Sequence, residues 1–345
     1  SALLERAVQG ALGRTGFYES QVSHLSIAEQ AVNDLDGGGI GPSLAAFQSA
    51  LSALSANPSS ADQRQALMNA ARDLGSAFSS TRSQLDLTAR GVRDDALSTA
   101  DKINSLTSQI AQIDQRMRGA RPGEERNTYA TQRAALVEQV ASLIDVDVRS
   151  NNDGTISLTT AGGRALVNGG VANKVVVSQD APPKSALAVS FEAPDGTKLP
   201  AVSNDFGGRL GGLVSMHNDT VMPAIENLDR LAYDFTTSFN SIHQAGFRAD
   251  GSAGGDFFDA PLSVEGAAAR VGLATGFTAN DIAAGLDPSM GAGDNGNLEL
   301  LMQAAGESGQ LAGGLSVPAT WRQISTSVSR ALSSAKTSAA FETAS

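Results

Sequence analysis

Histidine is the residue type in this chain best suited to acid–base or metal chemistry, and there are three: His24, His217 and His243. A metal site on a helix needs a second histidine or a carboxylate four residues away, because both ligands must project from one face. Each of the three histidines lies on or beside a predicted helical face without such a neighbour. We therefore interpret them as packing or surface residues, and an enzyme that uses His217 or His243 remains an alternative.

Clustered aspartates offer a second possible chemistry, calcium binding. Asp145-Val146-Asp147, followed by Asn151-Asn152-Asp153, resembles a calcium-binding loop in part. Arg149 and Ser150 occupy the positions of an oxygen ligand and the glycine, and no glutamate closes the loop, so we predict a hairpin turn. Asp250-Gly251 and Gly254-Gly255-Asp256 read as a solvated glycine-rich loop.

The sequence contains none of the common motifs of catalytic or nucleotide-binding sites. It contains no phosphate-binding Walker loop, no nucleophile elbow and no Ser/His/Asp arrangement. The sequence therefore predicts no catalytic residue, no cofactor-binding residue and no metal-binding residue. We expect a protein that is not an enzyme and that needs no cofactor.

The composition narrows the class of protein further. A chain of 345 residues can form two or more domains, and its net charge of −11 disfavours binding to nucleic acid or to an anionic membrane. Cysteine is absent, which excludes disulfides and thiolate metal sites. No apolar run approaches the roughly eighteen residues of a membrane span, and no signal peptide opens the sequence. Because the chain starts at Ser1 in a helical pattern, we expect it to be the middle of a longer protein.

The stretch from Ser60 to Met117 is the element around which the other helices are arranged. Its apolar positions recur every seven residues in a line, which predicts one helix of roughly 85 Å at 1.5 Å per residue with a coiled-coil seam. A second line beside it slips by one residue near Gly91, where the helix could bend or change partner. We expect most of these residues to be internal core. The first line is Ala71, Phe78, Leu85, Val92, Thr99, Leu106 and Ile113, and the second is Leu67, Leu74, Thr81, Thr88, Ala96, Ile103, Ile110 and Met117.

Helical periodicity also predicts the partners of this long helix. The predicted segments are Leu3 to Leu35, a shorter helix from Pro42 to Leu54, Glu124 to Ile144, Leu210 to Ile242 and Trp321 to Ala335. Ser60 is a good N-cap, with Gln63 at the capping-box position. Glycine-rich turns at Asp36-Gly37-Gly38-Gly39 and at Gly119-Ala120-Arg121-Pro122-Gly123 separate helices, and the second turn predicts an antiparallel helical hairpin. Pro223 predicts a kink, or a helix that begins near Asp219.

At Asp145 the apolar period changes from helical to two, which is typical of strands. We predict strands at 146–148, 156–158, 164–167, 175–177 and 187–191, with Asp153-Gly154 as a tight turn and Pro182-Pro183 as a break. The predicted domains are a discontinuous helical rod, 1–145 and 207–345, with a glycine-rich irregular stretch at 246–318, and a small β-domain at 146–206. We expect that β-domain to be dispensable for folding of the helices. The predicted fold class is multidomain α+β: an elongated antiparallel α-helical bundle or coiled-coil rod with an inserted small β-domain.

Two segments carry a resemblance to a known family. The first comprises Gly207-Gly208-Arg209-Leu210-Gly211-Gly212-Leu213, Asn227-Leu228-Asp229-Arg230-Leu231-Ala232, Phe239-Asn240-Ser241-Ile242-His243-Gln244-Ala245-Gly246 and Gly255-Asp256-Phe257-Phe258. The second is Phe47 to Ile110, with Asn57-Pro58, Arg64, Ile103-Asn104 and Gln109-Ile110-Ala111. Together they resemble the flagellar hook-associated protein 1 family over nearly the whole chain. We expect the family's terminal segments, which form the inner tube and carry the export signal, to lie outside this chain.

The resemblance implies a structural subunit of the bacterial flagellum at the hook–filament junction, exported through the flagellar secretion channel to the cell exterior. It implies as partners the hook protein, the second hook–filament junction protein and copies of itself in a ring. An export chaperone would bind the missing C-terminal segment. The alternatives are flagellin or the second junction protein, which share the rod plan, and a secreted adhesin with a helical stalk. The place of the 207–258 signature argues against the first two.

Overall fold

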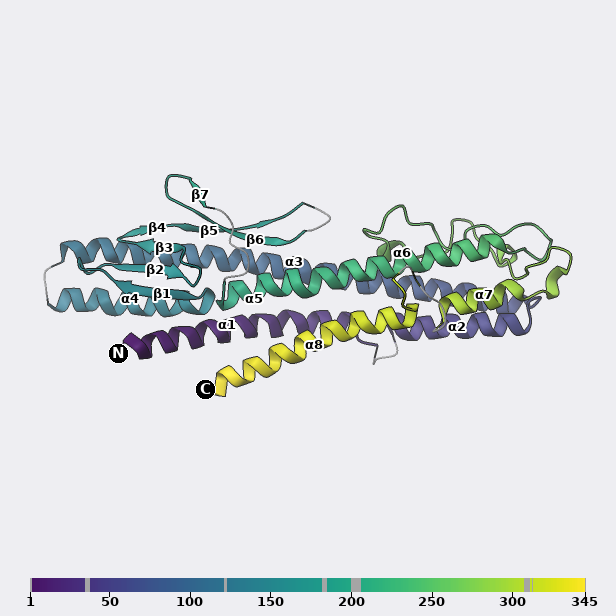
Figure 1. Ribbon diagram of the computed structural model, residues 1–345, viewed down its shortest axis with the longest axis horizontal. Helices are drawn as coiled ribbons and strands as arrows, with labels where there is room; N and C mark the ends of the chain where they lie inside the picture. The colour runs from purple at the N-terminus through teal and green to yellow at the C-terminus, as the bar shows by residue number, and fades with distance from the viewer. Residues whose placement is uncertain are drawn as a thin grey trace. The chain divides into compact units, whose positions relative to one another are not determined.

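The computed structural model describes residues 2–34, 38–120, 123–181, 185–199, 206–306, 311 and 313–344 (Figure 1). The chain forms two compact units. Unit 1 comprises Ser1–Ile27, Thr88–Met222 and Arg330–Ser345, and unit 2 comprises Ala28–Leu87 and Pro223–Ser329.

Helices, several of them long, contain most of the described residues, as the sequence predicts. They are α1 (Ala2–Ala31), α2 (Ile40–Ala56), α3 (Ala61–Gly119), α4 (Glu124–Leu143), α5 (Gly208–Met216), α6 (Met222–Ala245), α7 (Gly296–Ala305) and α8 (Val317–Ala344). Helix α1 ends before the predicted Leu35, which, like Asp36-Gly37, Arg121-Pro122 and Pro182-Pro183, lies outside the described residues. Within the described part of the chain, no helix combines the length and the apolar composition needed to cross a membrane.

Helix α3 runs for 59 residues and carries both predicted seams. All fifteen seam residues are buried, from Leu67 at 0% exposure to Ile113 at 8%. The helix continues through Gly91, so the slip between the seams does not interrupt it. The boundary between the two units crosses α3 between Leu87 and Thr88, close to this slip. The two ends of α3 therefore belong to different packed cores.

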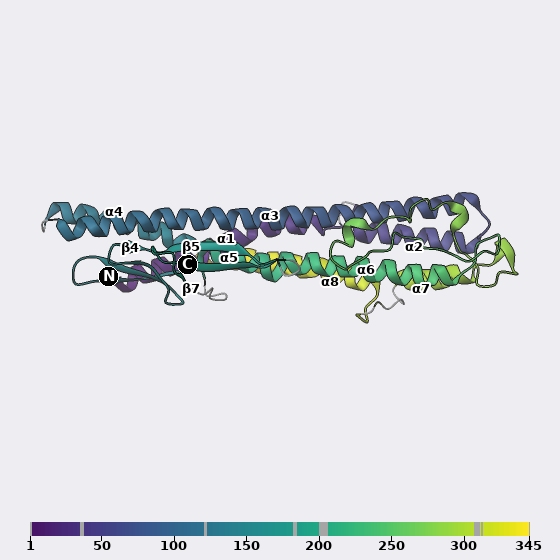
Figure 2. The same ribbon diagram turned by 90° about the horizontal axis from the view of Figure 1, so that it is seen from above.

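The predicted N-cap of α3 and the predicted pairing of α3 with α4 are both present. Ser60 caps the helix, since its Oγ accepts a hydrogen bond from the Gln63 backbone N–H at 3.3 Å. At the other end, α4 lies beside α3 in both Figure 1 and Figure 2. Arg133 of α4 donates to the buried Asp114 of α3 at 2.6 Å, which confirms the helical hairpin.

The chain does not start a new helix at Asp219. Instead α5 passes through a π-helical turn, His217–Val221, into α6. In this turn the Met222 N–H donates to the His217 carbonyl, five residues back. Pro223 has no N–H to donate, and the wider turn takes the place of a regular helical turn just before it.

Two antiparallel sheets follow α4 in unit 1. The first has the order β1 (Val146–Ser150), β2 (Ile156–Thr160), β3 (Ala165–Asn168) and β4 (Val171–Ala172). The second has the order β5 (Lys174–Gln179), β6 (Leu187–Glu192) and β7 (Lys198–Leu199). Strands β4 and β7 were not predicted, because two residues are too few to show a period of two.

The β1–β2 hairpin differs from the prediction in its turn. The Asn151 N–H donates to the Thr155 carbonyl at 2.8 Å and the Gly154 N–H donates to the Asn151 carbonyl at 3.1 Å. The loop therefore has three residues, Asn152 to Gly154, instead of a two-residue Asp-Gly turn. Gly154 has a φ of +87°, the left-handed conformation that glycine adopts easily.

Asparagine side chains attach the second sheet to the helices. Asn104 of α3 accepts from the Val175 N–H at 2.7 Å and donates to the Val175 carbonyl at 2.9 Å. Asn218 in the π-helical turn makes the same pair of bonds with Leu187, at 2.8 and 2.9 Å. Each side-chain amide thus bonds to both the N–H and the carbonyl group of one residue in the second sheet. Phe191 of β6 is fully buried.

Unit 2 has an aromatic core. Phe47 of α2, Phe235 and Phe239 of α6, and Phe257 and Phe258 lie 4.8 to 6.2 Å apart between ring centroids. All five are buried to 1% exposure or less. The described residues after Gly246 contain helix α7, which the sequence does not predict, and three short 3-10 turns, Ala268–Arg270, Ala279–Asp281 and Gly291–Gly293.

Candidate functional site

The first histidine is part of a link between three helices of unit 1. His24 Nε2 on α1 lies 2.8 Å from Asp95 Oδ2 on α3, and Arg209 of α5 donates to the same oxygen at 3.0 Å. The carboxylate comes from another helix, so i, i+4 spacing within one helix cannot reveal it. The three side chains hold α1, α3 and α5 together.

His243 is buried and has a structural role in unit 2. Its Nδ1 lies 2.7 Å from the Gly255 carbonyl oxygen, and its Nε2 accepts from the Ala283 N–H at 2.9 Å. Nδ1 must therefore carry the proton of a neutral ring. Burial lowers the pKa of His243, although the bond to Gly255 acts in the opposite direction.

His217 is also buried, at 1% exposure, with its Nδ1 3.1 Å from Asn218 Oδ1. Burial lowers its pKa, and the bond to Asn218 opposes this shift. His217 and His243 are thus inaccessible to a substrate, as packing residues would be.

The clustered aspartates fix turns. Asp153 accepts from the Thr155 N–H at 3.0 Å and from its hydroxyl at 2.6 Å, and Asp250 does the same with Ser252 at 2.9 and 2.6 Å. These bonds hold the pKa of both carboxyls below the usual value. Across the described ranges, no group of three or more histidine, cysteine or acidic side chains could hold a metal ion.

The signature segment that starts at Gly207 lets three elements approach closely. A Cβ at Gly212 of α5 would overlap the Phe17 carbonyl oxygen of α1, and one at Gly16 of α1 would overlap the Ser142 carbonyl oxygen of α4. Gly208 has a φ of +66° and packs against the Ile144 backbone. These glycines therefore serve helix packing.

Other signature residues hold the irregular stretch of unit 2 in place. Asn240 accepts from the N–H groups of Phe257 and Phe258 at 3.0 and 2.9 Å and donates to the Phe258 carbonyl at 2.8 Å. Asp229 accepts from the N–H groups of Gly266 and Ala268 at 2.9 and 3.0 Å. Buried polar side chains thus replace regular backbone pairing here.

Arg64 has the same function on α3. It is 5% exposed and donates to the carbonyl oxygens of Pro58, Ala279 and Ile282 at 2.9, 3.1 and 3.0 Å. Burial lowers the pKa of its guanidinium. Arg64 therefore fixes two loops of unit 2 to the start of α3.

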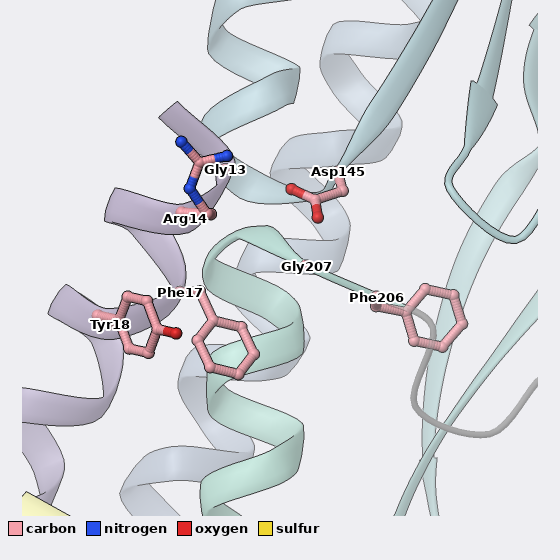
Figure 3. A pocket seen from close by; sticks show the side chains of 7 residues that line it. All are labelled: Gly13, Arg14, Phe17, Tyr18, Asp145, Phe206 and Gly207. Atoms are coloured by element: carbon pink, nitrogen blue, oxygen red, sulfur yellow. The ribbon is translucent and has the colours of Figure 1, made fainter. Parts of the chain in front are cut away.

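One pocket of unit 1 contains a buried carboxylate oxygen without a hydrogen-bond partner in the described part of the chain (Figure 3). It has a volume of about 320 Å³ and is lined by Gly13, Arg14, Phe17, Tyr18, Asp145, Phe206 and Gly207. The Oδ1 atom of Asp145 is buried and accepts no hydrogen bond from the described residues. Burial raises the pKa of Asp145, and the charge of Arg14 partly offsets that effect. The sequence suggests Asp145 only as a possible calcium ligand, and nothing in it places Asp145 opposite Gly13 and Gly207.

The fold and these signature contacts define a mainly helical protein in which the buried Asn240, Asp229 and Arg64 hold backbone segments in place. The model of the flagellar hook-associated protein FlgK helical domain matches residues 25–258. The chain belongs to this family.

Relatives of known sequence agree with the family match. Flagellar hook-associated protein 1 of Salmonella typhimurium is 29% identical over 262 residues, which cover 74% of this chain and 47% of the relative. The Escherichia coli protein is 29% identical over 247 residues, 69% and 45% of the two chains, and the Bacillus subtilis protein 25% over 267 residues, 71% and 53%. The chain thus spans about half the length of these relatives.

A solved structure supports the fold. The flagellar hook junction protein FlgK from Burkholderia pseudomallei superposes with a TM-score of 0.66 at 24% sequence identity. The match covers 73% of this chain and 46% of that one. The long helices and small antiparallel sheets of this chain, together with this match, confirm the predicted α+β fold class.

Proposed function

We propose that this protein is a structural subunit of the bacterial flagellum that connects hook and filament at their junction. The family match over residues 25–258 is the observation that carries the proposal. The structural roles of Asn240, Asp229 and the signature glycines support it, because these residues stabilise a scaffold. We infer that the protein has no enzymatic activity.

The proposed partners are the hook protein, the second hook–filament junction protein and further copies of this chain in a ring. We also propose export through the flagellar secretion channel to the cell exterior, with a chaperone that binds a C-terminal segment beyond this sequence. The matched relatives are hook-associated proteins by name, which favours these partners over nucleic acid or a membrane.

We also propose the division into a helical part and a β-domain that the sequence predicts. Residues 1–145 and 207–345 would form the helical part, with 246–318 as its irregular stretch, and residues 146–206 would form a projecting β-domain. The close approach of Gly208 to Ile144 supports this division, because both ends of the β-region then meet.

Deletion of the gene in the source bacterium tests the proposed role. Electron microscopy of the deletion strain should show hooks of normal length without attached filaments, and the intact gene on a plasmid should restore the filaments. Cells that keep their filaments would contradict the proposal. Lost hooks would indicate an earlier role in assembly. Lost adhesion with normal flagella would indicate an adhesin.

A further inference from the structure

We propose that the pocket between α1, Asp145 and Gly207 in unit 1 binds a guanidinium group, the side chain of an arginine presented by a partner protein. This inference goes beyond the proposed junction role and does not depend on which protein supplies the arginine.

Asp145 lacks hydrogen bonds that its carboxylate could accept from the described residues. Its buried Oδ1 has no hydrogen-bond partner, and no cation of the described residues lies within ion-pair distance of either carboxylate oxygen. Asp145 is half-buried, but a buried carboxylate oxygen without a donor is costly. The buried carboxylates Asp114 and Asp229 accept hydrogen bonds at both oxygens. Burial raises the pKa of Asp145, and the charge of Arg14 offsets this shift only in part.

Two glycines determine where the Asp145 carboxylate lies. Gly13 and Gly207 lie so close to the carboxylate that a Cβ at either position would overlap it. The absence of a side chain at Gly13 and Gly207 therefore makes room for the carboxylate at this position. Figure 3 shows its carboxylate directed towards α1, from which Arg14, Phe17 and Tyr18 project.

The cation near Asp145, Arg14, bonds to a different carboxylate. Arg14 lines the pocket, but its Nε donates to Glu342 of α8 at 2.8 Å instead of to Asp145. Arg14 thus forms its ion pair with Glu342, and its charge compensates that of Asp145 only in part.

The remaining walls select the type of cation. The rings of Phe17 and Tyr18 meet edge to face, with centroids 5.2 Å apart, on the α1 side of the pocket. A planar guanidinium can stack on aromatic rings and donate to a carboxylate at the same time, which an ammonium does less well. A volume of about 320 Å³ lies at the low end of small-ligand pockets, roughly 300 to 1,000 Å³, and suits one side chain.

Ligand-observed NMR with Nα-acetyl-arginine methylamide tests the proposal, with the neutral isostere Nα-acetyl-citrulline methylamide as the control ligand. The wild-type chain should bind the arginine probe and not the citrulline probe. Asp145→Asn should weaken binding about tenfold or more, since it removes the charged acceptor. Asp147→Asn, an exposed aspartate on β1, is the matched control and should leave binding unchanged.

Arg14→Gln distinguishes the proposal from an internal ion pair. If the pocket accepts an external guanidinium, this variant should bind the arginine probe at least as well as wild type. Binding by Arg14→Gln but not by wild type would show that Arg14 itself occupies the site, and would overturn the proposal. Equal binding of the two probes, equal binding by Asp145→Asn, or no binding by wild type would overturn it as well.

Discussion

Single buried amides determine the path of the chain beyond α6. Asn240 is 4% exposed and makes three hydrogen bonds to the backbone of Phe257 and Phe258, two rings of the aromatic core. One side chain therefore links the last turns of α6 to the stretch that completes this core.

Replacement of Asn240 by alanine should lower the free energy of unfolding by about 2 to 4 kcal/mol, because three buried backbone groups lose their partner. Urea unfolding followed by circular dichroism measures this change. Gln244→Ala is the matched control, since the Gln244 amide bonds to Asp256 on the exposed surface. Equal effects of the two variants would contradict the role assigned to Asn240.

The lowered pKa of His243 predicts how the stability of the folded protein depends on pH. Its pKa in the folded protein is depressed below the value of 6.5 that applies to the unfolded chain. Below pH 6.5 the unfolded chain binds more protons, so the stabilisation present above that pH is lost as the pH falls through the folded pKa. Each such histidine contributes a slope of at most about 1.4 kcal/mol per pH unit.

Unfolding free energies at pH 7.5, 6.5 and 5.5 check this prediction. The wild-type chain should lose stability between pH 6.5 and 5.5, and His243→Gln should be less stable at pH 7.5 but show a shallower loss. The charged groups near His243 are Arg248, Asp256 and Asp281, and they remain in the variant. A parallel loss in both proteins would show that other groups carry the pH dependence.

At the scale of elements, glycines set how closely the helices of unit 1 pack. Gly212→Ala should destabilise the protein, since the new Cβ would overlap the Phe17 carbonyl oxygen and Ser20 Oγ. Gly91→Ala on α3 should instead stabilise it by about 0.5 to 1 kcal/mol, because its Cβ meets only the His24 ring at 3.8 and 4.0 Å. Thermal melts of both variants measure the contrast. A melting temperature of Gly212→Ala at or above that of wild type would contradict the packing.

Elements with a long apolar period could be predicted from the sequence. The α3 seams are buried as expected because a seven-residue repeat over many turns specifies one face. The π-helical turn before Pro223 and the end of α1 could not be predicted, since both depend on local backbone geometry. Helix α7 has ten residues and too few turns to show its period within a glycine-rich stretch.

The candidate site could not be predicted in the same way. Asp145 joins residues from α1 and from the start of α5, which are far apart in the sequence. The sequence identified Asp145 as an acidic residue near other acids, but its missing hydrogen bond depends on the surrounding backbone. The partners of His24 and Asn240 also come from other elements, so their roles emerged with the structure.

At the scale of the whole molecule, the strands are closely tied to the helices of unit 1. Asp114 on α3 is fully buried and accepts from the Ile156 N–H at 3.1 Å, while Asn104 and Asn218 hold the second sheet. From the sequence we expect residues 146–206 to be dispensable for folding of the helices, and these contacts add the prediction that the strands stabilise those helices. The short distance between Ile144 and Gly208 still allows a linker to join the two ends.

Replacement of residues 146–206 by a glycine-serine linker should therefore retain helical content but lower the free energy of unfolding by roughly 3 kcal/mol, from the loss of these three side-chain contacts. Circular dichroism and urea unfolding measure both quantities. Insertion of the same linker after Gly196, an exposed turn, is the control and should change little. An unchanged unfolding free energy in the deletion variant would show that the strands are energetically independent.

The location of the protein on the flagellum tests the proposed function most directly. A peptide tag inserted after Gly196 of the full-length protein, in a strain that remains motile, can be labelled with immunogold and viewed by electron microscopy. The proposed function predicts one short band of label where the hook ends and the filament begins. Label along the whole filament, as for a flagellin, or over the cell surface, as for an adhesin, would contradict it.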